Sequence, residues 1–410
     1  MFDFTEIIDR SGRDSIAADS AAAIAGGSLG PRDTVVLEGF DTIPMWVADM
    51  SFATASSVTR ALRERINHPC FGYYEPSDQY YQSIAWWHES QKGMPGVSTE
   101  HVAYENGVLG GLINALGVLC SPGDGVLVHA PTYTGFTNTV GNAGYKLVPS
   151  PLVRDADGVW RMDYEDMERK VKCGGIHAAI LCSPHNPTGR VWERWELERA
   201  MDLLARYDVR VVSDEIWSDI ILDGNRHIPT QMVSEDARNR TVALYAPSKT
   251  FNLAGLVGSY RVVYDPWLRD RLARQSSLSH YNSQNVLSMH ALIGAYSQEG
   301  AAWLRELKMV LSENARIAHA FFDGVPGVAC SRPQGTYMLF VDCSSWCAGH
   351  GLHIDDVLRA GVERGVLWQD GRPFGGEATI RLNLALPTAR LHEALDRLGM
   401  YIFRDVQLLS

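Results

Sequence analysis

The sequence predicts an α/β protein with a large doubly wound domain, whose sheet is mainly parallel, and a smaller α+β domain. Three observations carry this prediction. Short β-branched runs alternate with helical patterns in the middle of the chain, and the pattern changes after about residue 280. The chain also has 410 residues and 46% hydrophobic content, which is enough for a core that divides in two.

The strands of the large domain are predicted from runs that are apolar on both faces, as buried parallel strands are. These runs cover residues 125–130, 177–182, 209–214 and 241–245. Between the second and third runs, residues 195–207 carry one apolar face at helical spacing, formed by Leu197, Ala200, Met201 and Leu204. This strand–helix–strand order is typical of a doubly wound domain.

The smaller domain is predicted from the C-terminal part of the chain. A helical region is predicted at 284–322. Strand-like segments are predicted at 336–341 and 379–384, and further helices at 354–364 and 389–398. Residues 17–30 are rich in small side chains and are predicted to form a loop or arm. We therefore expect three parts: an N-terminal arm with part of the small domain at 1–45, a large ligand-binding domain at 46–285, and the small domain at 286–410.

Charge and composition exclude several classes of protein. The net charge is −11 and the basic residues form no stripe, so nucleic acid is not an expected partner. No apolar run approaches the roughly 18–20 residues that span a bilayer, so no membrane segment is expected. The acidic N-terminus lacks a signal-peptide pattern, and the seven cysteines are dispersed without zinc spacing. We expect a cytoplasmic protein with reduced thiols and no metal.

Four clusters of distinctive residues follow predicted strands or begin a helix, which is where open parallel sheets bind ligands. Lys249 follows the fourth strand within APSKTFN, and Asp214 ends the third strand within SDEI. Asn186 follows the second strand within SPHNPTGR, and the glycine-rich run 106–112 begins a helix. Each cluster alone has a plain structural reading: a surface lysine, a helix N-cap, a turn and an ordinary helix start.

Together the four clusters favour one chemistry. A lysine that forms an imine must be deprotonated, which a desolvated pocket favours. An aspartate at a strand end can keep a pyridine nitrogen protonated, and an asparagine amide can reach a phenolic oxygen. Backbone N–H groups at a helix start bind phosphate. The order of the clusters, from phosphate loop through Asn and Asp to Lys, makes the joint interpretation stronger than any single one.

The motifs resemble the class I/II aminotransferase superfamily of fold-type-I pyridoxal-phosphate enzymes over nearly the whole chain. The resemblance is closest to the cystathionine β-lyase-like branch of MalY/PatB-type carbon–sulfur lyases. It is carried by PMWVADM, CSPHNPTGRVW, SDEI, APSKTFNLAGL and IRLN, at 44–50, 182–192, 213–216, 246–256 and 380–383. It implies pyridoxal 5′-phosphate as the cofactor, a small-molecule amino-acid substrate and a homodimer with shared active sites.

The resemblance also implies roles for single residues at the reacting centre. Lys249 resembles the Schiff-base lysine that later acts as acid and base at Cα, and Asp214 resembles the partner of the pyridine nitrogen. Asn186 is similar to the asparagine that hydrogen-bonds the cofactor O3′. Tyr133 lies where the family stacks an aromatic ring on the cofactor, and with Lys249 it is a catalytic candidate. Arg381 in IRLN resembles the arginine that clamps the substrate α-carboxylate; its plain alternative is a surface arginine on a strand.

Further residues are implied at the phosphate. The backbone N–H groups of Val108 and Leu109 and the hydroxyl of Ser248 are expected to bind it. So is a tyrosine of the partner subunit, for which Tyr73 is preferred over Tyr74 because it follows F-G-Y.

Three departures from the family pattern stand out. Trp217 occupies a cofactor-tuning position that is usually tyrosine or histidine, and an indole cannot relay protons. Val257 replaces a phosphate-binding arginine of many aminotransferases. The segment 15–30 replaces a lysine-plus-aromatic segment and suggests a changed substrate.

The expected activity is β-elimination from an S-substituted L-cysteine, either cystathionine-like or a larger conjugate, to give a thiol, pyruvate and ammonia. Two alternatives with the same cofactor stay open: an aminotransferase, or decarboxylative or oxidative deamination of a cysteine conjugate in a specialised biosynthetic pathway. A non-catalytic binding protein with this fold is a third reading, and the intact Lys249, Asp214 and Arg381 argue against it. Fold alone does not fix the reaction type.

Overall fold

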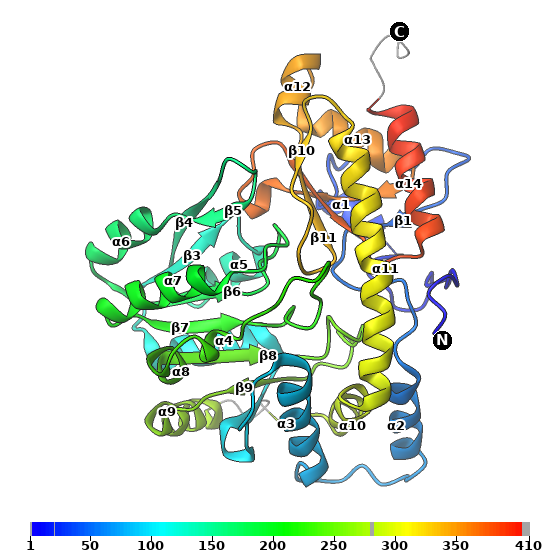
Figure 1. Ribbon diagram of the computed structural model, residues 1–410. Coiled ribbons are helices and arrows are strands. Elements are labelled where there is room, and N and C mark those ends of the chain that lie inside the picture. Colours follow the sequence, from blue (N-terminus) through cyan, green and yellow to red (C-terminus); the bar gives the residue numbers. More distant parts are fainter. Residues whose placement is uncertain (1, 20, 279–282, 404–410) are drawn as a thin grey trace. The chain divides into compact units, whose positions relative to one another are not determined.

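The computed structural model describes residues 2–19, 21–278 and 283–403 (Figure 1). The chain divides into two compact units, which are described separately. The smaller unit comprises 1–53, 187–189 and 306–410, and the larger unit comprises 54–186 and 190–305. The divisions at 53/54 and 305/306 differ from those expected at 45/46 and 285/286.

The later boundary arises from helix packing within the larger unit. Helix α10 (Val286–Ala295) packs against α2 (Ser56–Ile66) and α3 (Asp78–Lys92). The approach to α2 is close, since a Cβ on Gly294 would lie 2.6 Å from the carbonyl oxygen of Ser57. The region expected to be helical at 284–322 contains α10 and then α11 (Gln298–Asp323), which begins in the larger unit and continues into the smaller one. Ser297, between the two helices, accepts a hydrogen bond of 3.1 Å from the Gly300 N–H.

Among the described residues, the larger unit holds an eight-stranded sheet in the order β2-β9-β8-β7-β6-β3-β4-β5 (Figure 1). The central strands pair in parallel, in the order β4, β3, β6, β7 and β8. The outer pairs are antiparallel: β5 with β4, β9 with β8, and β2 with β9. All four strands predicted for the large domain are present. The strands are β2 (Val102–Glu105), β3 (Gly125–Ala130), β4 (Lys146–Arg154), β5 (Trp160–Met162), β6 (Ile176–Cys182), β7 (Arg210–Asp214), β8 (Thr241–Tyr245) and β9 (Ser259–Val262).

Helices cover both faces of this sheet, which confirms the predicted doubly wound architecture. On one face, α4 (Gly107–Leu119), α5 (Thr134–Asn142) and α9 (Pro266–Ser277) pack on a core that includes Val126 and Val128. On the other face, α6 (Tyr164–Lys172), α7 (Arg194–Arg206) and α8 (Glu235–Arg240) pack on a core that includes Leu127. Successive side chains of β3 thus enter opposite cores, as the period of two along a strand requires. Two short 3₁₀ helices, η1 (Thr99–His101) and η2 (Thr230–Met232), complete the described elements of this unit.

The smaller unit contains a four-stranded antiparallel sheet in the order β10-β11-β14-β13, within the described residues. A separate parallel pair joins β1 (Ile43–Pro44) to β12 (Val366–Leu367). The remaining elements are β10 (Ala329–Cys330), β11 (Met338–Asp342), β13 (Gln369–Asp370), β14 (Thr379–Asn383), α1 (Ala21–Gly26), α12 (Ser344–His350), α13 (Ile354–Glu363), α14 (Thr388–Tyr401) and the 3₁₀ helix η3 (Arg372–Phe374).

The segment 17–30, expected to be a loop or arm, is built into the smaller unit. It contains the short helix α1, and the carbonyl oxygen of Ala17 accepts a hydrogen bond of 3.2 Å from the indole N–H of Trp46. Leu29 is fully buried in a cluster with Trp46, Val362 and Leu367. The small side chains therefore allow close packing rather than an extended arm. Along the described ranges, no helix has both the length and the apolar character needed to cross a membrane.

Candidate active site

The loops that carry the predicted residues of the larger unit leave the sheet at one edge. Asp214, the last residue of β7, is level with Cys182 at the end of β6 and with Leu244 on β8. Tyr260 on β9 pairs with Tyr245 on β8 and also with Tyr104 on β2. The ends of β2, β6, β7 and β8 therefore meet, and the loops after them lie where parallel sheets bind ligands.

Asp214 is a buried carboxyl group at this edge. Burial raises its pKa to about 6, although the Ile216 N–H, 3.1 Å from Oδ1, and the nearby charge of Lys249 both lower it. No helix begins within residues 215–219, of which 216–219 form turns, so the N-cap interpretation does not describe this residue. A buried carboxyl group with a raised pKa favours a cationic hydrogen-bond donor as its partner.

Lys249 and Trp217 face each other on the turns that follow β8 and β7. The Lys249 Nζ atom lies 5.6 Å from the centroid of the Trp217 ring, and the indole is buried. Lys249 is itself only partly exposed, as is Ser248 before it, so it is not a lysine on an open surface loop. An indole face attracts an ammonium group, so Trp217 offers a favourable surface to a positive charge on this side chain.

Asn186 and Tyr133 lie in the loops after β6 and β3. Asn186 is buried, and its loop is closed by a hydrogen bond of 2.8 Å from the His185 N–H to the carbonyl oxygen of Arg190. Tyr133 immediately precedes α5, and its ring contacts Phe136 edge-on at a centroid distance of 5.4 Å. A Cβ on Gly135 would lie 2.3 Å from the Tyr133 ring, so only glycine at that position allows the ring to lie there.

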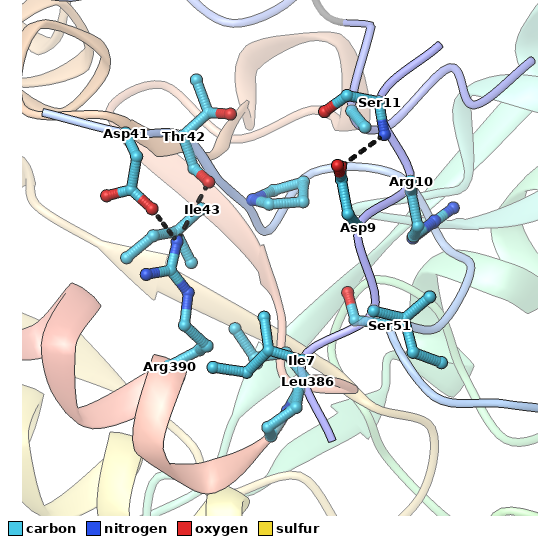
Figure 2. Close-up of a pocket in the computed structure, with 14 residues that line it drawn as sticks. Ile7, Asp9, Arg10, Ser11, Asp41, Thr42, Ile43, Ser51, Leu386 and Arg390 are labelled. Carbon is cyan, nitrogen blue, oxygen red and sulfur yellow. Dashed lines mark hydrogen bonds and ion pairs between the residues drawn. The ribbon is translucent and has the colours of Figure 1, made fainter. Parts of the chain in front are cut away.

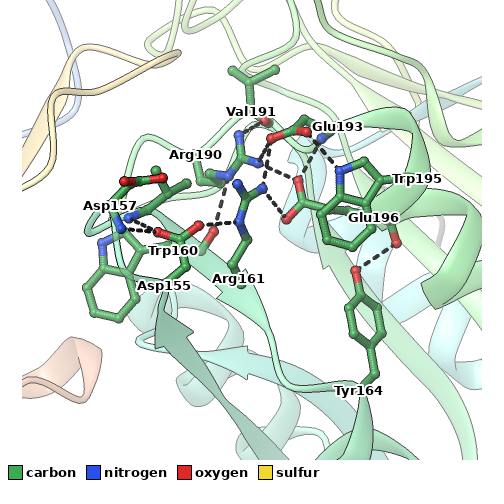
Figure 3. A network of polar contacts seen from close by, with 11 residues as sticks. Asp155, Asp157, Trp160, Arg161, Tyr164, Arg190, Val191, Glu193, Trp195 and Glu196 are labelled. Atoms are coloured by element: carbon green, nitrogen blue, oxygen red, sulfur yellow. Dashed lines mark hydrogen bonds and ion pairs between the residues drawn. The ribbon is translucent and has the colours of Figure 1, made fainter.

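The Arg190 side chain anchors the Asn186 loop through a network of ion pairs (Figure 3). Its guanidinium bonds to the carboxylate of Glu196, and it donates to Glu193 at 2.8 Å and to the carbonyl oxygen of Trp160 at 3.1 Å. Arg161 also donates to Glu193, at 2.7 Å. The side chains of Arg190 and Glu196 are only 3% and 0% exposed, so this is an ion pair of the interior.

Val108 and Leu109 lie in the first turn of α4, directly after β2. Gly107 begins the helix with a φ of 76°, a backbone conformation that glycine adopts readily. Further along, a Cβ on Gly111 would lie 2.8 Å from the Leu244 side chain, so the helix start packs close to the sheet. The N–H groups of a first helical turn have no acceptor within the helix, and such a terminus attracts anions.

Tyr73 and Tyr74 are the candidates for binding the cofactor phosphate of the other subunit, and they differ in their surroundings. Tyr73 is fully exposed, whereas the Tyr74 hydroxyl donates a hydrogen bond of 2.7 Å to the carbonyl oxygen of Gln284. Burial raises the pKa of Tyr74 to about 12. Tyr74 is thus engaged within its own chain.

Arg381 lies on β14 of the smaller unit and is buried, so it is not a surface arginine. It is 4% exposed, and its guanidinium carbon lies 4.5 Å from the centroid of the Phe374 ring. Its Nη2 atom donates to the carbonyl oxygen of Trp46, at 3.2 Å, and to the side chain of Gln369. These contacts hold the planar guanidinium in one orientation, as binding a carboxylate through two hydrogen bonds requires.

A cavity of about 320 Å³ also lies in the smaller unit (Figure 2). Ile7, Asp9 and Arg10 line one side of it. Arg390 lines another side, where it bonds to Asp41 and to the carbonyl oxygen of Thr42. None of the candidate cofactor- or substrate-binding residues lines this cavity.

Sequence reasoning missed two buried carboxylates that follow Asp214. Glu215 accepts hydrogen bonds from the Tyr245 hydroxyl at 2.8 Å and the Thr230 N–H at 3.0 Å. Asp219 pairs with Lys92, and both side chains are almost completely buried. The available signal was the clustering of three carboxylates within 214–219, between stretches that are otherwise apolar.

Comparison with known proteins identifies the family. Residues 41–398 match the model described as aminotransferase class I and II. The chain belongs to the class I and II aminotransferase family. This membership confirms the resemblance inferred from the motifs, together with the fold type.

Within the family, the chain is similar to several named proteins and solved structures. It is 34% identical to cystathionine β-lyase PatB of Bacillus subtilis (strain 168), over 87% of this chain and 92% of PatB. It is 32% identical to protein MalY of Escherichia coli (strain K12), over 96% and 97% of the two chains. Among solved structures, the PLP-bound C–S lyase from Staphylococcus hominis superimposes with a TM-score of 0.86 at 29% identity, covering 98% of both chains.

Proposed function

We propose that the protein is a pyridoxal-phosphate-dependent carbon–sulfur β-lyase that acts on an S-substituted L-cysteine. The similarity to a cystathionine β-lyase and to a C–S lyase supports the reaction class. The observation that carries the proposal is the placement of Lys249 beside the buried carboxyl group of Asp214 at one edge of the sheet.

The residues at this edge fit the cofactor by their chemistry. The Asp214 carboxyl group, with its raised pKa, suits a pyridinium N–H, and the buried Asn186 amide suits a phenolic oxygen. The first turn of α4 suits a phosphate, to which the Ser248 hydroxyl adds a donor. The Tyr133 ring offers an aromatic face, and the Lys249 amine offers a nucleophile for the aldehyde carbon.

When bound, pyridoxal phosphate supplies a protonated pyridine ring that accepts the electron pair left when the Cα–H bond breaks. The Lys249 amine takes the proton from Cα and becomes an ammonium group over the face of Trp217. The ionised Asp214 would pair with the ring N–H, and Arg381 would hold the substrate carboxylate and so set the orientation of the Cα–H bond. The Cβ–S bond then breaks. The balanced reaction is S-substituted cysteine plus water to thiol, pyruvate and ammonia.

We further propose that two copies of the chain form a homodimer, in which Tyr73 of the partner subunit binds the cofactor phosphate. The full exposure of Tyr73 within its own chain supports this assignment, because an aromatic side chain of this size is usually at least partly covered. Light scattering of the purified protein tests the dimer, and the cofactor dissociation constant of Tyr73→Phe tests the contact.

One experiment tests the reaction itself. Purified protein is given L-cystathionine and a panel of S-alkyl and S-glycosyl cysteines, and thiol and pyruvate are measured together. We expect equal amounts of both, lost in Lys249→Ala and kept in Arg274→Ala, which removes an exposed arginine on α9. Pyridoxamine phosphate formed without thiol would identify an aminotransferase instead. Carbon dioxide with an aldehyde would identify the decarboxylative reaction.

A further inference from the structure

A buried ion pair lies behind the loops that carry Trp217 and Lys249. Lys92, the last residue of α3, bonds through Nζ to the carboxylate of Asp219, and the two side chains are 2% and 3% exposed. A lysine at a helix C-terminus commonly extends into water, whereas this one is directed into the interior. Burying both charges costs several kcal/mol per ion, which only close pairing and further hydrogen bonds offset.

Those further bonds reach both loops. The Lys92 Nζ atom also donates to the Ser218 hydroxyl at 2.7 Å, and Ser218 follows Trp217 directly. The second oxygen of Asp219 accepts a hydrogen bond of 2.9 Å from the hydroxyl of Thr250, which follows Lys249 directly. The indole N–H of Trp87 on α3 donates to Asp219 at 3.0 Å and so ties the pair to the helix.

The pair is thus bonded to the neighbour of each of the two residues that face each other across 5.6 Å. We propose that Lys92 and Asp219 are positioning residues, which fix the Lys249 amine against Trp217 by holding Ser218 and Thr250. This inference rests on the proposed function, because it concerns the amine assigned to proton transfer. A purely structural ion pair would stabilise the fold without affecting the geometry of that amine.

The most specific variant is Thr250→Val, which removes the hydroxyl but keeps the side-chain shape and leaves Lys92 paired with Asp219. In the holoenzyme we expect kcat to fall about tenfold and KM to change less than about twofold, because a displaced amine slows proton transfer more than it weakens binding. The pH titration of the cofactor's visible absorbance should shift, and the cofactor dissociation constant should rise. Thr250→Ser restores the hydroxyl and should restore all of these properties.

A pair of substitutions separates position from stability. Lys92→Met leaves a buried carboxylate unpaired and should lower the midpoint of thermal unfolding strongly. Combining it with Asp219→Asn should recover most of that midpoint but not kcat or the absorbance titration. Arg240→Met is the control: it removes a buried cation that pairs with Asp236 at the opposite end of β8, and it should change stability alone.

Wild-type kcat, absorbance titration and cofactor affinity in Thr250→Val would overturn the inference and leave the pair a structural one. Recovery of kcat together with thermal stability in the double variant would overturn it as well. If the wild type released no thiol from any substrate, the proposed function would fail instead. The absorbance and affinity comparisons among the variants would still decide whether the pair positions Lys249.

Discussion

The Nζ atom of Lys249 lies 5.6 Å from the centroid of the Trp217 ring, and the two residues belong to turns that follow adjacent strands. An indole presents a negative face to an ammonium group and has one N–H donor but no acceptor. In the proposed reaction we therefore expect Trp217 to stabilise the charge that Lys249 gains with the Cα proton, and to take no part in moving that proton further.

This relationship predicts the effect of changing the ring. Trp217→Leu removes the aromatic face and should lower kcat about tenfold, whereas Trp217→Phe keeps a weaker face and should lower it only about threefold. The rate of Cα proton abstraction is measured directly by single-turnover kinetics with a substrate deuterated at Cα. A Trp217→Leu enzyme as fast as the wild type would show that the indole only fills space.

A second prediction concerns Asp214 in the protein without cofactor. Its pKa of about 6 lies above the ordinary 3.8 of an aspartate, chiefly because of burial, so the folded state binds the proton more tightly than the unfolded state does. The contribution of Asp214 to the free energy of unfolding should therefore fall by about 3 kcal/mol as the pH rises from about 4 to about 6, and stay level above that range. Urea unfolding at a series of pH values measures this contribution as the difference in slope between the wild type and Asp214→Asn.

The matched variant for that measurement is Asp214→Asn, which has no proton to lose and should lack this contribution. Adding pyridoxal phosphate to the wild type should also remove it, because a pyridinium partner keeps the carboxylate ionised. Identical slopes for wild type and Asp214→Asn would show that the carboxyl group titrates as it does in water.

Arg381→Lys tests the carboxylate clamp. Lysine keeps the charge but cannot form two parallel hydrogen bonds, so kcat/KM for an S-substituted cysteine should fall about 100-fold. The control is the matching S-substituted cysteamine, which lacks the carboxylate and should react equally poorly with both enzymes. If the variant lost activity equally towards both compounds, the role of Arg381 would be structural, through its stacking on Phe374.

The sequence was sufficient for the features that are local in the chain. The strands that lead to Asn186, Asp214 and Lys249 are short apolar runs. Each strand ends at such a residue or four residues before it, so strand and candidate site could be predicted together. The Lys92–Asp219 pair could not be predicted, because 127 residues separate its members and neither belongs to a periodic pattern.

The segment 17–30 was harder to predict for a different reason. Its small residues lack the spacing of a buried helix, and Leu29 is buried only because Trp46, Val362 and Leu367 are brought to it from elsewhere in the chain. Packing partners that are distant in sequence likewise place residues 286–305 with the larger unit.

The last prediction concerns the ion pair of Arg190 and Glu196, which anchors the loop of Asn186 (Figure 3). Burial raises the pKa of Glu196 and lowers the pKa of Arg190, so for both groups burial disfavours the charge more than their partners favour it. Glu196 has a second cation nearby, because Arg161 lies 3.2 Å from its other oxygen. Arg190 has the half-exposed Glu193 as a further ion-pair partner.

Removing one member of the pair should therefore have unequal costs. Glu196→Gln keeps the cap on the Glu193 N–H but removes the buried carboxylate that pairs with Arg190, and it should lower the free energy of unfolding by about 3 kcal/mol. Arg190→Met should cost less, because Arg161 remains beside Glu196, and the double variant should recover most of the loss. Urea unfolding measures all three, with Arg194→Met on the exposed face of α7 expected within about 0.5 kcal/mol of wild type. The idea would be wrong if the two single variants lost equal unfolding free energy and the double variant lost the sum of both. The two charges would then act independently, and burial would not decide their cost.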